Sequence, residues 1–521
     1  MRPQPGGSGL AYNRGVPTTS PSPTEPAASA GAAPTVVIGG GLAGLAAAAR
    51  LARGGRRVLL LESRPRLGGR ATSFDDAGSG ESIDNCQHVG MGCCTALQQF
   101  CEEAGLGDLF RIERELTFID ARGRRSRFVG RQLPAPLHLA PAFAGLKYLT
   151  WRDRIQIGRG LQALARDPGP WEGSFADWLI GHGQGEPARR LFWHVVLVSA
   201  LSETLDRIDT AAAKKVFVDG FLSNAAAYEV HLPRRPLDDL YGEPMLRHLR
   251  SLGVEVRTGA AVSQVDIHAD IQADIQADIQ ADIEEETVAG VTLRDGETIP
   301  AAAVVLAVPF HRVNALLPEA ARLPQLDRLE SAPIASVHLW LDRPITDLPH
   351  AVLVEHLSQW VFARPPAADG RLGHYYQVVI SASRDVIARP RAEVIAQVVA
   401  ELRSVFPDAV DAAVLRSRLV VEKRAVFSIR PGSDRLRPSQ ATSTRGLVLA
   451  GDYTRTGWPA TMEGAVRSGE LAAAVLLGAP PAIPSDLPRG RLARWFIGPD
   501  AASEAAWSDR PADPARSPLG V

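Results

Sequence analysis

The pattern of apolar and polar positions predicts a strand–turn–helix–strand unit near the start of the chain. Residues 35–38 (TVVI) form an apolar run with the length of a buried strand. The segment that ends near residue 53 is rich in Ala and Leu, which favour helix. Residues 58–61 (VLLL) form a second buried run. A unit in which strand, helix and strand follow one another predicts an α/β fold.

The remaining pattern alternates between strand-rich and helix-rich parts. Residues 133–249 are mostly helical in pattern, with aromatic side chains and Arg interleaved, and we expect them to cap an active site. Residues 331–383 have strand character. We further expect helices at 95–104, 391–406 and 461–477, strands at 254–265, 288–308, 337–341, 375–381 and 446–450, and hairpin turns within 117–128 and at Asp295–Gly296.

Three segments have biased composition. Residues 1–33 are rich in Pro, Gly, Ser and Ala, and they predict a disordered extension. Residues 479–521 predict a mostly disordered tail, with 495–497 (WFI) as its apolar anchor. Residues 269–284 repeat the unit ADIQ, ending in Glu284. Ile at every fourth position is compatible with a helical stripe, but an expanded hairpin loop without function is the preferred interpretation.

The turn after the first strand carries the dinucleotide-binding fingerprint G-x-G-x-x-G. Gly39 makes the tight turn, Gly41 lets the backbone approach a pyrophosphate, and Gly44 lets the helix pack closely on the strand. The second strand ends on Glu62, near the spacing expected for the acid that binds a ribose hydroxyl. The following helix would point its positive N-terminus at the phosphates.

The residues after this acid identify the dinucleotide. Residues 66–70 (RLGGR) resemble the second half of the flavin-binding signature of the amine oxidase and phytoene desaturase superfamily. The resemblance implies FAD rather than NAD, with Gly68 and Gly69 close to the pyrophosphate and Arg70 in contact with it. It implies further FAD contacts from Arg64, Val262, Met462 and Ala465.

A second cofactor element lies near the C-terminal end. The apolar run 446–450 leads into Gly451 and Asp452, and an Ala-rich helix follows. This arrangement resembles the C-terminal FAD motif of the same superfamily. The resemblance implies that Asp452 contacts the ribityl-pyrophosphate and that the helix N-terminus faces the flavin, where it would stabilise an anionic reduced ring.

Length, charge and cysteine usage bear on the number of domains, the kind of partner and the cellular compartment. The chain has 521 residues, enough for two or more domains, and a net charge of −1, which gives no electrostatic reason to expect nucleic acid. Its four cysteines fall within residues 86–101, which does not look like a secreted disulfide framework and favours the cytoplasm.

The Cys spacing lacks the paired C-x2-C of zinc sites, so no metal is expected. No apolar run is long enough to span a membrane, while peripheral attachment at its inner face stays open.

Three stretches together resemble the squalene-associated FAD-dependent desaturases, now understood as hydroxysqualene dehydroxylases of hopanoid biosynthesis. They are residues 83–88 (IDNCQH), 133–139 (LPAPLHL) and 450–461 (AGDYTRTGWPAT), and the resemblance spans roughly residues 34–478. Cys86 departs from the family pattern, which has Gly there, and a thiol near the flavin could alter the pocket.

The resemblance implies an amine-oxidase-like α/β fold: a Rossmann-type FAD-binding domain with an interleaved substrate domain of mixed sheet and helical cap. We expect the FAD-binding domain to be discontinuous, formed by residues 34–90, 250–330 and 440–478. Residues 91–249 and 331–439 are then expected to form the substrate domain.

The implied reaction is reduction of hydroxysqualene to squalene, with protonation of the leaving hydroxyl and hydride transfer from flavin N5. His88 is the candidate acid because an unperturbed imidazole titrates near the working pH. A structural role below the flavin is an equal alternative. Asp84 is expected to hold this loop in place. The implied partners are a hydrophobic isoprenoid substrate and prenyl-synthase-like pathway enzymes.

Other functions stay open. Carotenoid desaturation is the nearest rival, followed by a flavin amine oxidase, although only Tyr453 and Trp458 could imitate an aromatic cage, and then by a non-catalytic flavin-binding scaffold. Residues 133–164 mix apolar and basic side chains, which suits either a membrane-facing entrance or an ordinary cap helix. The aromatic residues Trp340, Trp360, Tyr375 and Tyr376 are compatible with a substrate cavity or with plain core.

Overall fold

A five-stranded parallel sheet organises the first part of the fold. The computed structural model describes residues 33–272, 283–364 and 373–498. The strand order is β10-β2-β1-β14-β20, and every neighbouring pair is parallel. β1 and β2 are the two predicted buried runs. The strands are β1 (Thr35–Ile38), β2 (Val58–Glu62), β10 (Glu255–Thr258), β14 (Ala303–Leu306) and β20 (Leu447–Leu449).

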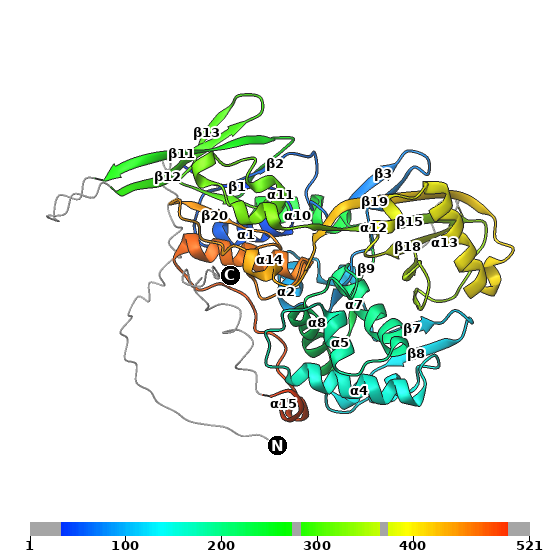
Figure 1. Cartoon of the computed structure of the whole chain (residues 1–521). Helices are drawn as coiled ribbons and strands as arrows, with labels where there is room; N and C mark the ends of the chain where they lie inside the picture. Colours follow the sequence, from blue (N-terminus) through cyan, green and yellow to red (C-terminus); the bar gives the residue numbers. More distant parts are fainter. Residues whose placement is uncertain (1–32, 273–282, 365–372, 499–521) are drawn as a thin grey trace, which may run out of the picture. The chain divides into compact units, whose positions relative to one another are not determined.

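Two helices pack tightly beside this sheet. α1 (Leu42–Arg53) and α14 (Met462–Leu477) lie against each other (Figure 1). A Cβ at Gly469 of α14 would lie 2.2 Å from the carbonyl oxygen of Ala43, so the two backbones approach too closely for any side chain there. Both helices were predicted, and both are confirmed.

A seven-stranded mixed sheet forms the second part. Its order is β19-β15-β18-β17-β16-β7-β8, and all neighbours are antiparallel except β16 and β7. The predicted hairpin at 117–128 is confirmed as β7 and β8, and α13 (Arg391–Val405) was predicted as a helix. The long strand β19 was missed. The strands are β7 (Glu115–Ile119), β8 (Arg125–Val129), β15 (Ser331–Leu341), β16 (His350–Leu353), β17 (Trp360–Ala363), β18 (His374–Ile380) and β19 (Val414–Phe427).

Helices make up most of residues 133–249, as predicted. α4 and α5 each begin with a capping box. The hydroxyl of Thr150 or Ser174 accepts from the backbone N–H of the Asp at the third helical position, and the carboxylate of that Asp accepts from the backbone N–H of the Thr or Ser. The strand β9 (Val230–Pro233) interrupts the helices and was not predicted. The helices are α3 (Ala140–Ala144), α4 (Trp151–Arg166), α5 (Phe175–Gly181), α6 (Glu186–Ala188), α7 (His194–Leu201), α8 (Thr210–Phe217), α9 (Asp238–Tyr241) and α10 (Glu243–Ser251).

The repeat lies at the end of a long hairpin. β11 (Val262–Gln272) and β12 (Ile283–Leu293) pair antiparallel, with Gln272 opposite Ile283. The first ADIQ unit is therefore strand and not helix, while residues 273–282 lie outside the described residues. The turn at Asp295–Gly296 joins β12 to β13 (Thr298–Pro300) as predicted. The remaining short elements are β3 (Ser73–Asp76), β4 (Glu81–Asp84), β5 (Gly90–Met91), α2 (Thr95–Glu103), β6 (Phe110–Glu113), α11 (Phe310–Val313) and α12 (Arg384–Ile387).

The expectation of a mostly disordered tail from residue 479 is wrong for residues 479–498. The N–H of Gly490 donates to the carbonyl oxygen of Ser223 over 2.9 Å. α15 (Arg491–Ile497) then packs on α4, where Arg166 donates to the carbonyl oxygen of Phe496 (Figure 1). Leu487 packs near Trp458, so this Pro-rich segment has more apolar contacts than its composition indicated.

The expected extension (1–33) and the end of the tail (499–521) fall almost entirely outside the described residues. The described residues form one compact unit, and the finer domain division stays a prediction. Among them, no helix combines the length and the apolar character that crossing a bilayer requires.

Candidate cofactor and substrate site

Two glycine-rich turns meet backbone to backbone after β1 and β2. The N–H of Gly68 donates to the carbonyl oxygen of Gly40 over 2.8 Å. Gly69 has φ +62°, and a Cβ on it would lie 2.9 Å from the Cα of Gly41. The fingerprint and the later G-G pair therefore form one bare backbone surface, which suits a pyrophosphate.

Gly39 and Gly44 have the turn and packing roles predicted for them. Gly39 has φ +109°, and a Cβ there would lie 2.5 Å from the carbonyl oxygen of Ala307. A Cβ on Gly44 would lie 1.9 Å from the carbonyl oxygen of Gly39. Gly44 does not line the cavity described below, so its link to the cofactor is through packing alone.

Glu62 holds the first turn from the end of β2. Its carboxylate accepts from the N–H of Gly40 over 2.7 Å and from the N–H of Arg64 over 2.8 Å. The side chain is buried and still lines the cavity. An acid fixed at this strand end fits the expected contact with a ribose hydroxyl.

Arg70 joins the two cofactor motifs. Its guanidinium donates to Asp452 over 2.7 Å and to the carbonyl oxygen of Ala425 over 2.8 Å. Asp452 follows Gly451, whose N–H donates to Ser468 of α14. Residues almost four hundred positions apart in the chain thus meet at one place, as the two resemblances required.

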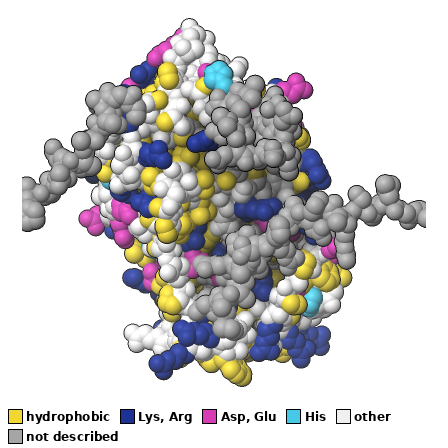
Figure 2. Space-filling view, turned by 90° about the vertical axis from the view of Figure 1, so that its left-hand side faces the viewer, with side chains coloured by type: hydrophobic (Ala, Val, Ile, Leu, Met, Phe, Trp, Pro, Cys, Tyr) yellow, Lys and Arg dark blue, Asp and Glu magenta, His cyan; other side chains and the backbone are white. Residues whose placement is uncertain are grey.

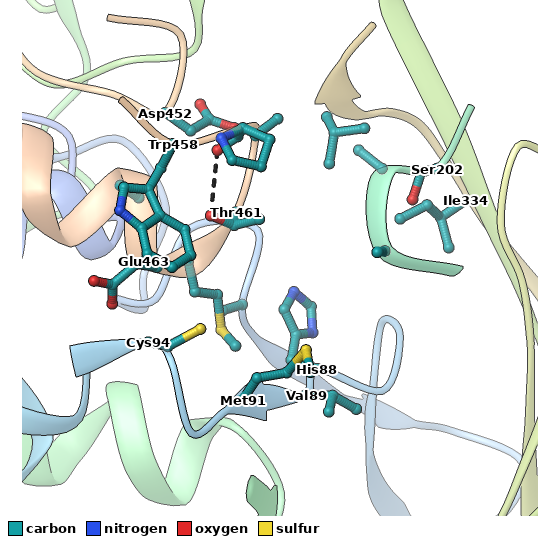
Figure 3. A pocket seen from close by; sticks show the side chains of 18 of the residues that line it. His88, Val89, Met91, Cys94, Ser202, Ile334, Asp452, Trp458, Thr461 and Glu463 are labelled. Atoms are coloured by element: carbon teal, nitrogen blue, oxygen red, sulfur yellow. Dashed lines mark hydrogen bonds between the residues drawn. The ribbon is translucent and has the colours of Figure 1, made fainter. Parts of the chain in front are cut away.

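The N-terminus of α14 faces the cavity. The Thr461 side chain accepts from the N–H of Gly464 and caps the helix. The buried Glu463 carboxylate accepts from the N–H groups of Ala96 and Leu97, and so caps α2 rather than the site. Figure 3 shows Thr461 and Trp458 on one wall, with Glu463 directed away from His88.

A single cavity of about 1040 Å³ joins these elements. Its bare glycine backbone, its acid at a strand end and its helix N-terminus fit a flavin dinucleotide. Its lining includes every predicted site residue except Gly44: Gly39, Gly41, Glu62, Arg64, Gly68, Gly69, Arg70, His88, Val262, Gly451, Asp452, Met462 and Ala465.

The cap side of the cavity is aromatic and aliphatic. Trp360 lines it, whereas Trp340, Tyr375 and Tyr376 do not and belong to the buried core. A chamber of this kind suits a long hydrocarbon, which gains free energy by leaving water. The apolar lining includes Phe118, Phe128, Leu139, Phe143, Leu146, Tyr148, Leu161, Leu191, Phe192, Val196, Phe217, Phe221, Trp360 and Phe362.

His88 lies on the cavity wall opposite Thr461, and its ring points into the pocket (Figure 3). Its Nδ1 lies 3.0 Å from the carbonyl oxygen of Cys86, which places a proton on Nδ1 in the neutral ring. Burial lowers the pKa of His88 below its usual value. The expectation that this imidazole titrates unperturbed is therefore wrong, because the apolar surroundings disfavour its charged form.

Asp84 holds the loop that carries His88, as expected. Its carboxylate accepts from Ser73 Oγ over 2.7 Å and from the N–H of Leu237 over 2.8 Å, and it pairs with Arg364. The residue is only 1% exposed. Its lone pairs are committed to these partners, so it has a positioning role.

The cysteines are reduced and packed. Burial raises the pKa of Cys86 to about 12, so its thiol stays protonated even though it lines the cavity. Burial likewise raises the pKa of Cys101 to about 12. All four are free thiols, and the described residues contain no cluster of His, Cys, Asp and Glu suited to a metal ion.

An aromatic cage of the amine oxidase type is not formed by the two candidates. Tyr453 is fully buried and does not line the cavity. Trp458 does line it, with the ammonium of Lys215 4.5 Å from its ring centroid. Only one of the two rings can meet a substrate.

Lys215 and Asp219 form a charged pair in the cavity wall that was missed in the sequence. They belong to α8 and the π-helical turn after it, and their side chains are 2.7 Å apart. Their spacing of four along a helix was the available signal, but it occurs on many solvated helix faces.

Comparisons with known proteins agree with this geometry. Residues 42–477 match the family model described as flavin containing amine oxidoreductase. The chain is 28% identical to a 15-cis-phytoene desaturase of Solanum lycopersicum, over 88% of this chain and 79% of that one. It is 27% identical to the 15-cis-phytoene desaturase of Synechococcus elongatus, over 85% and 95%.

Solved structures show the same fold at low identity. An oxidoreductase from Methanosarcina mazei has a TM-score of 0.62 and 18% identity, covering 85% of this chain and 99% of that one. Cyclohexylamine oxidase from Brevibacterium oxydans has a TM-score of 0.59 and 20% identity, covering 86% and 99%. These matches confirm the amine-oxidase-like α/β fold. The chain belongs to the flavin containing amine oxidoreductase family and is an oxidoreductase with FAD as its cofactor.

Proposed function

We propose that this flavoprotein reduces hydroxysqualene to squalene. In this reaction a C–O bond breaks, a C–H bond forms in its place, and the hydroxyl leaves as water after taking up a proton. When bound, reduced FAD supplies the hydride of the new bond.

One observation carries the proposal: a single cavity combines the cofactor motifs, an apolar chamber and the imidazole of His88. The apolar chamber suits a C30 hydrocarbon and excludes water from the reacting carbon. The loop of residues 83–88, whose sequence favours this family, places His88 on the cavity wall. Hydrocarbon, acid and cofactor can therefore meet there.

The chain's own residues divide the work as follows. The protonated form of His88 donates its Nε2 proton to the leaving hydroxyl, while the carbonyl oxygen of Cys86 orients the ring through Nδ1. Asp84 holds the loop. Aromatic walls such as Phe192 and Phe217 stabilise positive charge that develops on the substrate carbon.

Carotenoid desaturation is the second candidate, and the relatives favour it. The curated proteins named above are phytoene desaturases, and the same chamber suits a polyene. An amine oxidase activity has less support because Tyr453 is outside the cavity lining. A non-catalytic scaffold has the least, since both cofactor motifs are intact. Prenyl-synthase-like enzymes that make the substrate are the proposed pathway partners.

The test starts with purified protein whose FAD has been reduced without oxygen. On addition of hydroxysqualene, we expect flavin reoxidation and formation of squalene in equal amounts, followed by absorbance and mass spectrometry. In a parallel arm, oxidised protein receives phytoene. Flavin reduction by phytoene, together with no response to hydroxysqualene, would replace the first proposal with the second.

A further inference from the structure

The surface around α3 and α4 exposes large apolar side chains. Leu133 and Leu137 are each 43% exposed, Ile155 is 54% exposed and Trp151 is 71% exposed. Trp495 of α15, which packs on the same helix, is 73% exposed. These five residues, here called the docking face, lie on segments that meet at the helical cap, because α15 packs on α4 and a Cβ on Gly490 would lie 3.7 Å from the carbonyl oxygen of Ala135.

The charge of this region is one-sided. Between residues 133 and 166 the only acid is Asp153, which is buried in the capping box of α4. Every other Asp and Glu lies outside residues 133–166 and α15, so the sequence of these segments is basic. Figure 2 shows Lys and Arg side chains gathered beside hydrophobic ones at the lower edge of the molecule. The basic residues of 133–166 and α15 are Lys147, Arg152, Arg154, Arg159, Arg166, Arg491 and Arg494.

The cavity opens at the same place. Ala140 of α3 and Gly158 of α4 both line the cavity and are exposed. A Cβ on Gly158 would meet nothing within 4 Å, so the wall is open there. The exposed face of α4 runs from Trp151 past Ile155 to Gly158, which brings apolar surface to the edge of the opening.

We infer that this docking face binds the surface of an anionic lipid bilayer, so that the substrate enters the cavity from the membrane between α3 and α4. Exposed Trp and Ile side chains enter the interfacial layer, and the arginines meet lipid phosphates. α4 alone supplies a contact roughly 24 Å long, given a rise of 1.5 Å per residue. α15 extends it with Trp495, although it lies beyond the family match, which ends at residue 477.

The inference rests on the proposed function only in that the substrate is lipid-soluble. The test is co-sedimentation of the full chain with phosphatidylcholine vesicles, with and without phosphatidylglycerol. We expect binding to the vesicles with phosphatidylglycerol, weakened by salt. Trp151→Ser combined with Trp495→Ser should weaken it at least roughly tenfold, because apolar burial is lost.

The charge contribution is tested separately. The double variant Arg152→Gln, Arg159→Gln should bind anionic vesicles more weakly, by roughly fivefold per arginine. Its binding to vesicles of phosphatidylcholine alone should not change. Matched controls change exposed residues elsewhere: Val410→Ser with Leu415→Ser, 56% and 54% exposed, and Arg328→Gln with Arg391→Gln. The controls should bind like the unchanged protein.

The inference is overturned if the protein does not bind vesicles, or if the control variants lose as much vesicle binding as the docking variants. It is also overturned if the protein self-associates and the two Trp substitutions abolish this, because a second copy of the chain would then cover the docking face. Turnover measured in detergent micelles tests the proposed hydroxysqualene reduction independently of membrane docking. Docking variants should keep full turnover of hydroxysqualene in micelles. Vesicle binding by a protein that leaves hydroxysqualene unchanged would refute the reaction and leave the docking face standing.

Discussion

At the scale of single residues, burial decides which protonation states the site contains. Cys86 lines the cavity, but burial raises the pKa of its thiol to about 12, so it offers neither a nucleophile nor a metal ligand at neutral pH. The same surroundings lower the pKa of His88. Cys86, which stands where the dehydroxylase pattern that the sequence resembles has Gly, therefore adds bulk and no charge.

The pH dependence of turnover follows from His88. Its charged form is the acid, and this form disappears as pH rises through a pKa that lies below the usual 6.5. We therefore expect kcat to rise as pH falls from 8 toward 5. His88→Gln should lower kcat by about 100-fold or more, with a flat profile and normal FAD content. Steady-state rates and flavin absorbance across this range measure both.

His311→Gln is the matched control. His311 also lines the cavity, and burial lowers its pKa to about 4. The proposal expects this variant to keep the pH profile of the unchanged protein. Loss of FAD in His88→Gln would instead assign His88 a structural role below the flavin.

At the scale of elements, the cofactor cradle depends on two turns that only glycine can form. Gly69 has a positive φ and presses against Gly41, so a methyl group would push the two turns apart. The predicted strand–turn–helix unit is correct, yet its function depends on this contact between turns that follow different strands.

Gly69→Ala should therefore weaken FAD binding by more than tenfold. Gly55→Ala is the control, because Gly55 also has a positive φ, +80°, but a Cβ there meets nothing within 4 Å. Both changes carry a backbone cost of about 1–2 kcal/mol, so both lower the melting temperature. Only the first should lose FAD, measured by equilibrium dialysis. Equal FAD loss in both variants would contradict the cradle.

At the scale of the whole molecule, the C-terminal segment (479–498) connects the cofactor side to the helical cap. Asp486 pairs with Arg467 of α14 and lies 3.7 Å from Lys215 of the cap. Beyond it, Gly490 bonds to Ser223 and α15 rests on α4. Residues 479–498 therefore contact both the cofactor-binding helix α14 and the helical cap.

Truncation after residue 478 should lower the melting temperature by a few degrees, since these contacts contribute several kcal/mol in a chain of this size. Truncation after residue 498 keeps all of them and is the control. Thermal unfolding followed by flavin fluorescence distinguishes the two. Identical melting temperatures would show that the segment does not stabilise the cap.

The sequence alone was sufficient for the features that local chemistry specifies. The fingerprint that begins at Gly39, the acid Glu62 at the end of the second strand and the Gly-Asp pair at 451–452 were each recognisable from the strand and turn around them. The local pattern therefore predicted an α/β dinucleotide-binding unit, and the resemblance of residues 66–70 to a flavin-binding signature identified the dinucleotide as FAD. The strand β9, the long strand β19 and the ordered segment after 479 were missed because their order comes from distant partners.

Only the tertiary structure decided how these parts act together. In the structure Arg70 pairs with Asp452, and Trp360 lines the cavity whereas Tyr453 does not. Burial lowers the pKa of His88. The tertiary structure also brings α15 beside α4 at the cavity opening. Long-range packing and desolvation depend on the summed contacts of many residues, which no local pattern contains.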